Sequence, residues 1–248
     1  MNKTNCEKKL DLPALVIPAY EPDKSLLEIV SNLGGSFSCT IVVNDGSSRQ
    51  YQPLFNELER REGVIVLEHP VNRGKGAALK TAFNYLLLLN SHPCGVVTMD
   101  ADGQHSCEDA RGIVHALSQS PQTLYLGVRD FKEGAPWKSR IGNRVTRRLL
   151  KLFTRLNLMD TQTGLRGIPL RLLPHLLTIG ANGYDFELEM LFTARRRGVG
   201  IAEIPVRTLY VDNNRKSHFN PLKDSAKIYF VFFRYLVGTL RSKAGEDS

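Results

Sequence analysis

The sequence predicts an α/β fold in which a mainly parallel sheet is flanked by helices within a single domain. Three observations support this. Short apolar runs alternate with amphipathic helical segments, as in βαβ units. Gly, Pro, Asn and Asp close most of these runs, and 248 residues can bury a sizeable core. We expect an N-terminal tail over residues 1–11, the domain over residues 12–220, and a C-terminal apolar helix and tail over residues 221–248.

The first half of the chain alternates regularly. Buried strands are predicted at residues 12–20, 39–43, 64–67 and 95–99, with helices at residues 26–33, 53–61 and 77–89 between them. Ser25 is expected to cap the first helix. Ligands bind beyond the carboxyl ends of parallel strands, so the polar residues that follow these strands are candidates for a binding site.

The second half is less regular. Helices are predicted at residues 108–119, 140–156, 185–197 and 221–240, and strands at residues 123–128 and 201–210. The polar or glycine-punctuated segments at residues 131–138, 160–167 and 211–220 are predicted to be loops.

Composition limits the class of protein. The formal net charge of +8 indicates an anionic partner such as a nucleotide, a phospholipid surface or a nucleic acid. The four cysteines lack zinc-ligand spacing, so we expect reduced, mostly structural thiols in a cytosolic protein. No signal peptide is expected, and no run reaches the ~20 apolar residues of a spanning helix. The sequence therefore predicts a soluble or peripheral protein.

Two carboxylates, Asp100 and Asp102, follow the apolar run at residues 95–99. Like charges this close repel each other unless a cation lies between them, and hard oxygen ligands favour a divalent ion. Gly103 supplies a turn, and Gln104 can add a neutral oxygen ligand. The alternative is an ordinary solvated turn, but the position at the end of a buried strand favours a metal site.

Two further polar turns have a functional and a structural interpretation. At residues 44–48 (NDGSS), Asp45 can hydrogen-bond a base or ribose, or the segment can simply cap the next helix. At residues 72–76 (NRGKG), a helix start offers free N–H groups and Lys75 to an anionic ligand, or it is a plain helix start. The Walker A spacing is missing.

Four segments occur in a characteristic order: IPAY at residues 17–20, NDGSS at 44–48, NRGKGAA at 72–78 and DADGQH at 100–105. In this order they resemble family 2 glycosyltransferases of GT-A fold, closest to the dolichyl- and polyprenyl-phosphate mannosyl- and glucosyltransferases. Segments at residues 127–129, 139–143, 163–166, 184–189 and 215–218 continue the resemblance, which spans residues 12–220.

The resemblance implies a site for a nucleotide-sugar donor. Pro18, Ala19 and Tyr20 would line the nucleotide pocket, Asp45 would contact the base or ribose, and Lys75 would meet the donor's phosphates. Asp100, Asp102 and Gln104 would hold Mg²⁺ or Mn²⁺ against the diphosphate, where the ion assists the departing nucleoside diphosphate as a Lewis acid.

The resemblance also implies an acceptor side. Arg129 and Arg140 would meet an acceptor phosphate, and Arg215 the donor diphosphate or that phosphate. A polyprenyl phosphate is already anionic and needs no general base. A sugar hydroxyl would need one, for which Asp185 or Glu187 is the candidate. The alternative is that both carboxylates only favour the dipole of their helix.

The sequence departs from the family pattern at two positions and leaves two histidines open. Glu21 stands where Asn is common, and Asn44 replaces the first of two usual aspartates, which leaves donor choice open. His105 and His218 are possible ligands; His218, close to Arg215, is the better candidate.

Two helices bear on membrane contact. The basic amphipathic helix at residues 140–156 suits an anionic membrane surface or a solvated face of the domain. The C-terminal helix is apolar all round, so it packs on the domain, enters the bilayer interface or pairs with a partner.

Together these observations predict an inverting, metal-dependent glycosyltransferase. It would move a sugar from a UDP- or GDP-sugar to a polyprenyl phosphate, peripherally bound at the cytoplasmic membrane face. One alternative is transfer to a saccharide hydroxyl in surface polysaccharide synthesis; another is a non-catalytic lipid- or nucleotide-binding relative. A dehydrogenase is disfavoured because G-x-G-x-x-G does not follow the first strand. A nucleic-acid-binding protein would explain the charge but not the ordered carboxylates.

Overall fold

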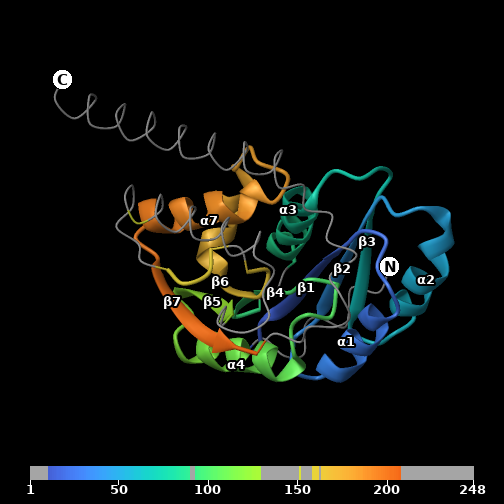
Figure 1. The fold of residues 1–248 in the computed structure, drawn as a ribbon, viewed down its shortest axis with the longest axis horizontal. Helices are drawn as coiled ribbons and strands as arrows, with labels where there is room; N and C mark the ends of the chain where they lie inside the picture. Colours follow the sequence, from blue (N-terminus) through green and yellow to red (C-terminus); the bar gives the residue numbers. More distant parts are fainter. Residues whose placement is uncertain (1–10, 90–92, 130–150, 152–157, 162, 208–248) are drawn as a thin grey trace.

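A computed structural model describes residues 11–89, 93–129, 151, 158–161 and 163–207 of the chain. Seven strands form one sheet in the order β3-β2-β1-β4-β6-β5-β7 (Figure 1). The strands are β1 (Ala14–Ala19), β2 (Thr40–Asp45), β3 (Val64–His69), β4 (Gly95–Thr98), β5 (Thr123–Arg129), β6 (Arg166–Pro169) and β7 (Gly200–Val206). The α-helices of the described residues are α1 (Ser25–Leu33), α2 (Gln52–Glu59), α3 (Lys75–Leu87), α4 (Cys107–Gln119), α6 (Leu173–Leu177) and α7 (Asp185–Arg196).

The sheet is mainly parallel, as the sequence predicts. Strands β3, β2, β1 and β4 run parallel to one another, β5 is parallel to β7, and β6 is antiparallel to both β4 and β5. The chain winds outward from β1 to β2 and β3, then returns to place β4 on the other side of β1. Such a reversal of strand order leaves a crevice outside the carboxyl ends of the two central strands.

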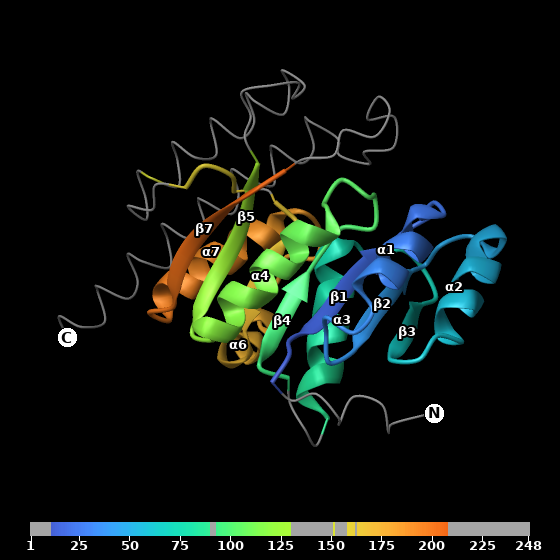
Figure 2. The ribbon, with the colours of Figure 1, turned by 90° about the horizontal axis from the view of Figure 1, so that it is seen from below.

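Helices cover both faces of the sheet (Figures 1 and 2). On one face, α3, α6 and α7 pack against residues such as Val16, Ile41 and Val43; on the other, α1, α2 and α4 pack against Leu15, Ile17 and Val42. Alternate residues of one strand thus enter two separate cores. This two-sided burial explains why the central strands read as continuous apolar runs rather than as alternating ones.

The α/β prediction is confirmed, but two elements of the second half were missed. The segment predicted as a loop at residues 160–167 leads into the short strand β6, and α6 follows it. Strand β6 has only four residues, so no periodicity marks it, and its pairing with distant strands decides its conformation. The predicted helices at residues 140–156 and 221–240 lie largely or wholly outside the described residues, as do residues 208–220. The domain boundaries therefore stay predictions.

The start of α1 differs from the predicted cap. Ser25 is the first residue of the helix, and the Ser25 N–H donates to Asp23 Oδ1 at 2.9 Å. Asp23 therefore supplies the acceptor that the sequence assigned to Ser25. A carboxylate two residues upstream can do this because an Asx turn brings its oxygen to that N–H.

Cysteine pairing also differs from the prediction. Cys39 is disulfide-bonded, whereas Cys94 and Cys107 are free. The expectation of reduced thiols is therefore wrong for Cys39. Spacing along the chain carries no signal of pairing, because the fold decides which sulfur atoms meet. Within the described residues, no helix is long and apolar enough to cross a membrane.

Candidate active site

The strand ends β1, β2 and β4 bring the predicted site residues to one edge of the sheet. Pro18 and Ala19 end β1, with Ala19 beside Asn44 of β2, and Asp100 lies two residues beyond the end of β4. Tyr20, which follows β1, is 37% exposed. The structure therefore places the IPAY, NDGSS and DADGQH segments at one edge of the sheet, where the strand order reverses.

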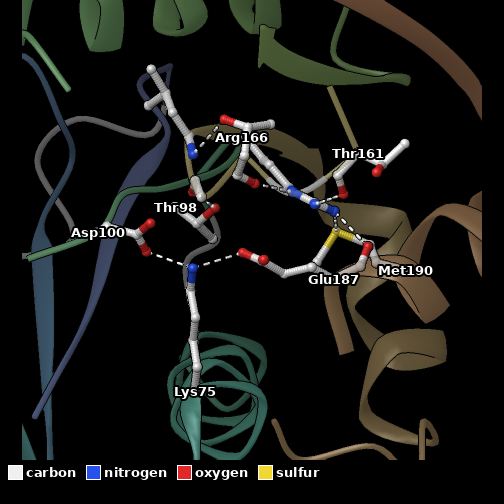
Figure 3. Close-up of polar contacts among 10 residues, drawn as sticks. Lys75, Thr98, Asp100, Thr161, Arg166, Glu187 and Met190 are labelled. Atoms are coloured by element: carbon white, nitrogen blue, oxygen red, sulfur yellow. Dashed lines mark hydrogen bonds and ion pairs between the residues drawn. The ribbon is translucent and has the colours of Figure 1, made fainter. Parts of the chain in front are cut away.

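Lys75 joins this edge of the sheet to α7. Its Nζ lies 2.5 Å from Asp100 Oδ1 and 2.8 Å from Glu187 Oε1, so one ammonium forms two ion pairs. The side chains of Lys75 and Glu187 are 14% and 5% exposed, whereas that of Asp100 is 28% exposed. In Figure 3 the lysine extends from the start of α3 and ends between the two carboxylates. Asp100 is thus the member of this cluster that is most open to solvent.

Close packing of α3 against α7 explains how Lys75 reaches Glu187. A Cβ at position 76 would lie 2.6 Å from Phe186 Cβ, and one at position 74 would lie 2.5 Å from the Asn182 carbonyl oxygen. Gly74 also has a φ of 96°, which L side chains rarely adopt. The glycines on both sides of the lysine are therefore what lets the two helix starts meet.

The first turn of α3 is partly occupied by protein groups. The Ala77 N–H donates to the Asn182 carbonyl at 3.1 Å, so one N–H of the predicted anion-binding helix start already has a partner. The ammonium of Lys75 also lies 5.8 Å from the centre of the Tyr184 ring. Residues 182–184, just before α7, thus cover this helix start.

The two ion pairs set the charge of Lys75. Burial lowers the pKa of an amine, but the fields and hydrogen bonds of Asp100 and Glu187 outweigh it, so the pKa of Lys75 is raised. Lys75 is consequently a permanent cation at this edge of the sheet.

Asp102 and Gln104 lie on a tight turn after Asp100. The Gln104 N–H donates to Asp102 Oδ1 at 3.1 Å, and Gly103 between them has a φ of 73°. Among the described residues, no three His, Cys, Asp or Glu side chains are grouped so that they could hold a metal ion by themselves. Asp100 holds one cation, the Lys75 ammonium, and Asp102 follows two residues later. Their carboxylates and the Gln104 amide are oxygen donors of the kind that a divalent ion takes together with ligands from outside the protein.

Behind this edge, Arg166 is a fully buried arginine at the start of β6. Its guanidinium donates to the carbonyl oxygens of Thr163 (2.9 Å), Glu187 (2.7 Å) and Thr161 (3.1 Å). Burial lowers the pKa of Arg166, and the carboxylates of Glu187, Asp160 and Asp100 oppose that effect. Figure 3 shows the guanidinium directed between Thr161 and the residues Glu187 and Met190 of α7. Arg166 therefore fixes the loop against the helix that carries Glu187.

Gly164 lies directly against the Asp100 carboxylate. A Cβ at position 164 would lie 2.2 Å from Asp100 Oδ2, and the Thr98 hydroxyl donates to the Gly164 carbonyl at 2.9 Å. Any larger residue at 164 would push the carboxylate aside. The absence of a side chain at 164 is therefore required for the observed position of Asp100.

Asp45 is buried and holds the loop before α3. Its Oδ1 accepts the Arg73 N–H at 2.9 Å and lies 2.6 Å from His69 Nδ1, while its Oδ2 accepts the Gly74 N–H at 2.8 Å. His69 Nε2 in turn lies 2.9 Å from the Thr81 hydroxyl. The carboxylate that the resemblance assigns to the base or ribose therefore also sets the course of the chain into Lys75.

The remaining predicted residues are placed as follows. Asp185 is the first residue of α7 and accepts the Gly183 N–H at 3.0 Å. Arg129 ends β5 and pairs in register with Val206 of β7. Three predicted residues lie outside the described part of the chain: Arg140, Arg215 and His218. His105 is described and is buried, with 6% of its surface exposed. The structure thus describes most of the residues predicted to meet the donor, whereas much of the predicted acceptor side lies outside the described residues.

Comparison with known proteins identifies the family. The family described as "Glycosyl transferase family 2" matches residues 14–176, about two thirds of the chain. The chain belongs to this family. It is therefore a glycosyltransferase, and the family expected from the order of its motifs is confirmed.

Relatives and solved structures agree with this assignment. The UDP-N-acetylglucosamine–dolichyl-phosphate N-acetylglucosaminyltransferase of Methanococcus voltae is 28% identical, covering 90% of this chain and 94% of its own length. The polyprenol monophosphomannose synthase of Mycolicibacterium smegmatis is 24% identical, covering 77% and 75%. Glucosyl-3-phosphoglycerate synthase of Mycobacterium tuberculosis, solved with Mn²⁺, UDP and glucosyl-3-phosphoglycerate, has a TM-score of 0.68 at 18% identity, covering 96% and 84%. The chain is thus a family 2 member near the polyprenyl-phosphate glycosyltransferases.

Sequence reasoning missed the structural part of the site. It named Lys75 as a phosphate ligand and Glu187 as a base, but not their ion pair, and it gave no role to Gly164 or Arg166. The available signal was a lysine between two glycines, and an arginine within an otherwise apolar stretch at residues 165–169. Neither pattern predicts which distant residue contacts the lysine or the arginine.

Replacing Arg166 by methionine is expected to destabilise the protein by about 3 kcal/mol, because three buried carbonyl groups lose their donor. Denaturant unfolding measures the change. Arg171→Met is the control, since Arg171 is exposed and makes one bond to the Gln122 carbonyl; it should change stability by no more than about 0.5 kcal/mol. Equal effects of the two variants would contradict the structural role of Arg166.

Gly164→Ala is expected to lower sugar-transfer activity by about tenfold or more while the protein stays folded, because the new methyl group displaces the Asp100 carboxylate. The assay compares initial transfer rates and circular dichroism. Gly112→Ala is the matched control: Gly112 lies on α4 with no atom within 4 Å of an added Cβ, so activity should be retained. Full activity of Gly164→Ala would show that the position of Asp100 is unimportant.

Proposed function

We propose that this glycosyltransferase moves a sugar, with inversion, from a UDP- or GDP-sugar to a polyprenyl phosphate, with help from Mg²⁺ or Mn²⁺. The observation that carries the proposal is the position of Asp100 and Asp102 just beyond the end of β4, beside the end of β1. The names of the relatives from M. voltae and M. smegmatis support a polyprenyl-type acceptor. The M. voltae name also includes a UDP-sugar, which favours UDP as the leaving group.

Asp100, Asp102 and Gln104 are the residues that would hold the divalent ion. The ion would supply Lewis-acid stabilisation of the negative charge that develops on the departing diphosphate. The fold neighbour from M. tuberculosis was crystallised with Mn²⁺ and UDP, which supports an ion of this kind. The NRGKG turn, held by Asp45, would place Lys75 beside the same diphosphate.

The carboxylates near the crevice support an acceptor that arrives already ionised. Glu187 is engaged with Lys75, and Asp185 accepts a backbone N–H at the start of α7. To act as a general base, either carboxylate would have to turn its oxygen from this partner toward the acceptor. A phosphate monoester is itself a nucleophile near neutral pH and requires no such base. Transfer to a saccharide hydroxyl would need one of these carboxylates to leave its partner.

A lipid-linked acceptor would bring the enzyme to a membrane surface. The net charge of +8 and the basic pattern of residues 140–156 support peripheral binding to anionic lipid at the cytoplasmic face. Arg129, Arg140 and Arg215 would then meet the acceptor phosphate or the donor diphosphate through their guanidinium groups.

Thermal unfolding with nucleotides tests the donor site. UDP with Mn²⁺ is expected to raise the midpoint, because a ligand that binds only the folded state adds about 2.7 kcal/mol of stability at a hundredfold excess over its dissociation constant. GDP under the same conditions is the comparison that names the base. If neither UDP nor GDP shifts the unfolding midpoint, a nucleotide-sugar donor is contradicted.

Asp102→Asn is expected to reduce sugar transfer to polyprenyl phosphate by at least about a hundredfold, because one of the two anionic metal ligands is lost. Glu108→Gln is the control, since Glu108 is an exposed carboxylate on α4 close by in sequence and its side chain is 82% exposed. Radiolabelled sugar entering the lipid phase measures turnover. Transfer only to a saccharide acceptor, with none to the lipid phosphate, would overturn the proposed acceptor.

A further inference from the structure

Lys75 and a divalent ion compete for the same carboxylate. The Lys75 Nζ lies 2.5 Å from Asp100 Oδ1, which is within direct ion-pair distance. The ammonium therefore uses one of the two carboxylates from which the chain would bind a metal. The assignment of Lys75 to the donor phosphates does not account for this contact.

Glu187 is a second carboxylate partner of the Lys75 ammonium. Its carboxylate is 2.8 Å from Lys75 Nζ and only 5% exposed, so it is nearly out of reach of solvent. A buried carboxylate without a cation is strongly unfavourable, which keeps Lys75 beside Glu187 whatever happens at Asp100. The Tyr184 ring, 5.8 Å from Nζ, also favours a cation at this place.

We propose that Lys75 is a built-in counter-ion that holds Asp100 in place before the divalent ion binds, and that yields Asp100 to the ion while Glu187 retains the ammonium. The inference rests on the proposed function only in that the Asp100–Asp102 pair takes a divalent ion. A lysine suits this exchange because its ammonium is a compact charge on a flexible stem.

The exchange has two consequences of opposite sign. Before the ion binds, Lys75 neutralises two carboxylates and so stabilises the folded chain. When the ion binds, the same positive charge opposes it and occupies part of its site, so Lys75 lowers the affinity for the metal. A lysine that met only the donor phosphates would not compete with the metal ion for Asp100, and its removal would not lower the stability of the metal-free protein.

The test measures Mn²⁺ binding to the full chain in the absence of nucleotide, from the electron paramagnetic resonance signal of free Mn²⁺. Lys75→Met is expected to bind Mn²⁺ about tenfold more tightly than the unsubstituted chain, since a nearby positive charge and a competitor for Asp100 are both removed. Its unfolding midpoint without metal should fall, and added Mn²⁺ should restore more of it than in the unsubstituted chain.

Lys80→Met is the matched control. Lys80 is on the same helix, and its Nζ donates to the carbonyl oxygens of Ile179 and Ala181 rather than to a carboxylate. This variant should also lose stability, but its Mn²⁺ affinity should equal that of the unsubstituted chain. Glu187→Gln should bind Mn²⁺ more weakly, because Lys75 is then left with Asp100 as its carboxylate partner within this cluster.

The double variant Lys75→Met/Glu187→Gln keeps the test valid if the single lysine variant fails to fold. It removes both members of the buried pair, so no unpaired carboxylate is left at 187. We expect it to fold and to bind Mn²⁺ more tightly than the unsubstituted chain.

Unchanged or weaker Mn²⁺ binding by the foldable lysine variant would overturn the inference, and so would the absence of binding in every form. Sugar transfer is scored separately. Transfer that depends on Mn²⁺, together with unchanged affinity in Lys75→Met, would leave the proposed function intact and refute only the exchange. Tighter Mn²⁺ binding by Lys75→Met, without nucleotide binding by any form, would support the exchange and refute the proposed nucleotide-sugar donor.

Discussion

The need to neutralise buried charge connects the elements around this site. Arg166 and Glu187 lie almost wholly out of water, and a charge in such a place is tolerated only with partners. Arg166 donates to the backbone carbonyls of Thr161, Thr163 and Glu187, and the Glu187 carboxylate pairs with the Lys75 ammonium. Through Lys75 the same cluster reaches Asp100 beyond β4. Four segments distant in sequence are therefore held in one arrangement by electrostatics as much as by apolar packing.

Small residues make these contacts possible. The ion pair of Lys75 with Glu187 requires α3 and α7 to approach until a Cβ at position 76 would overlap Phe186. The position of Asp100 likewise requires the backbone of Gly164 against its carboxylate. The glycines of the NRGKG and TGLRG segments thus serve close approach between parts of the protein.

The sequence predicted the first half of the fold well, because each element there carries its own local signal. Buried parallel strands read as apolar runs, and α3 and α4 carry an apolar face of helical period. It failed at β6, whose four residues are extended only because β4 and β5 lie on either side. In the site, the strand-end carboxylates were predicted since strand ends converge. The sequence could not predict the partners of Lys75 and Asp45, because Glu187 on α7 and His69 on β3 come close to these residues only in the tertiary fold.

The state of the carboxylates also bears on the chemistry that this site suits. Three acidic side chains near the crevice, Asp45, Asp100 and Glu187, are already engaged with backbone N–H groups, a histidine or Lys75. These contacts orient backbone segments and balance the charge of neighbouring groups. A hydroxyl nucleophile would need one of these carboxylates to leave its partner, whereas the phosphate acceptor that we propose would not. The proposed phosphate acceptor thus agrees both with the engaged carboxylates and with the net charge of +8.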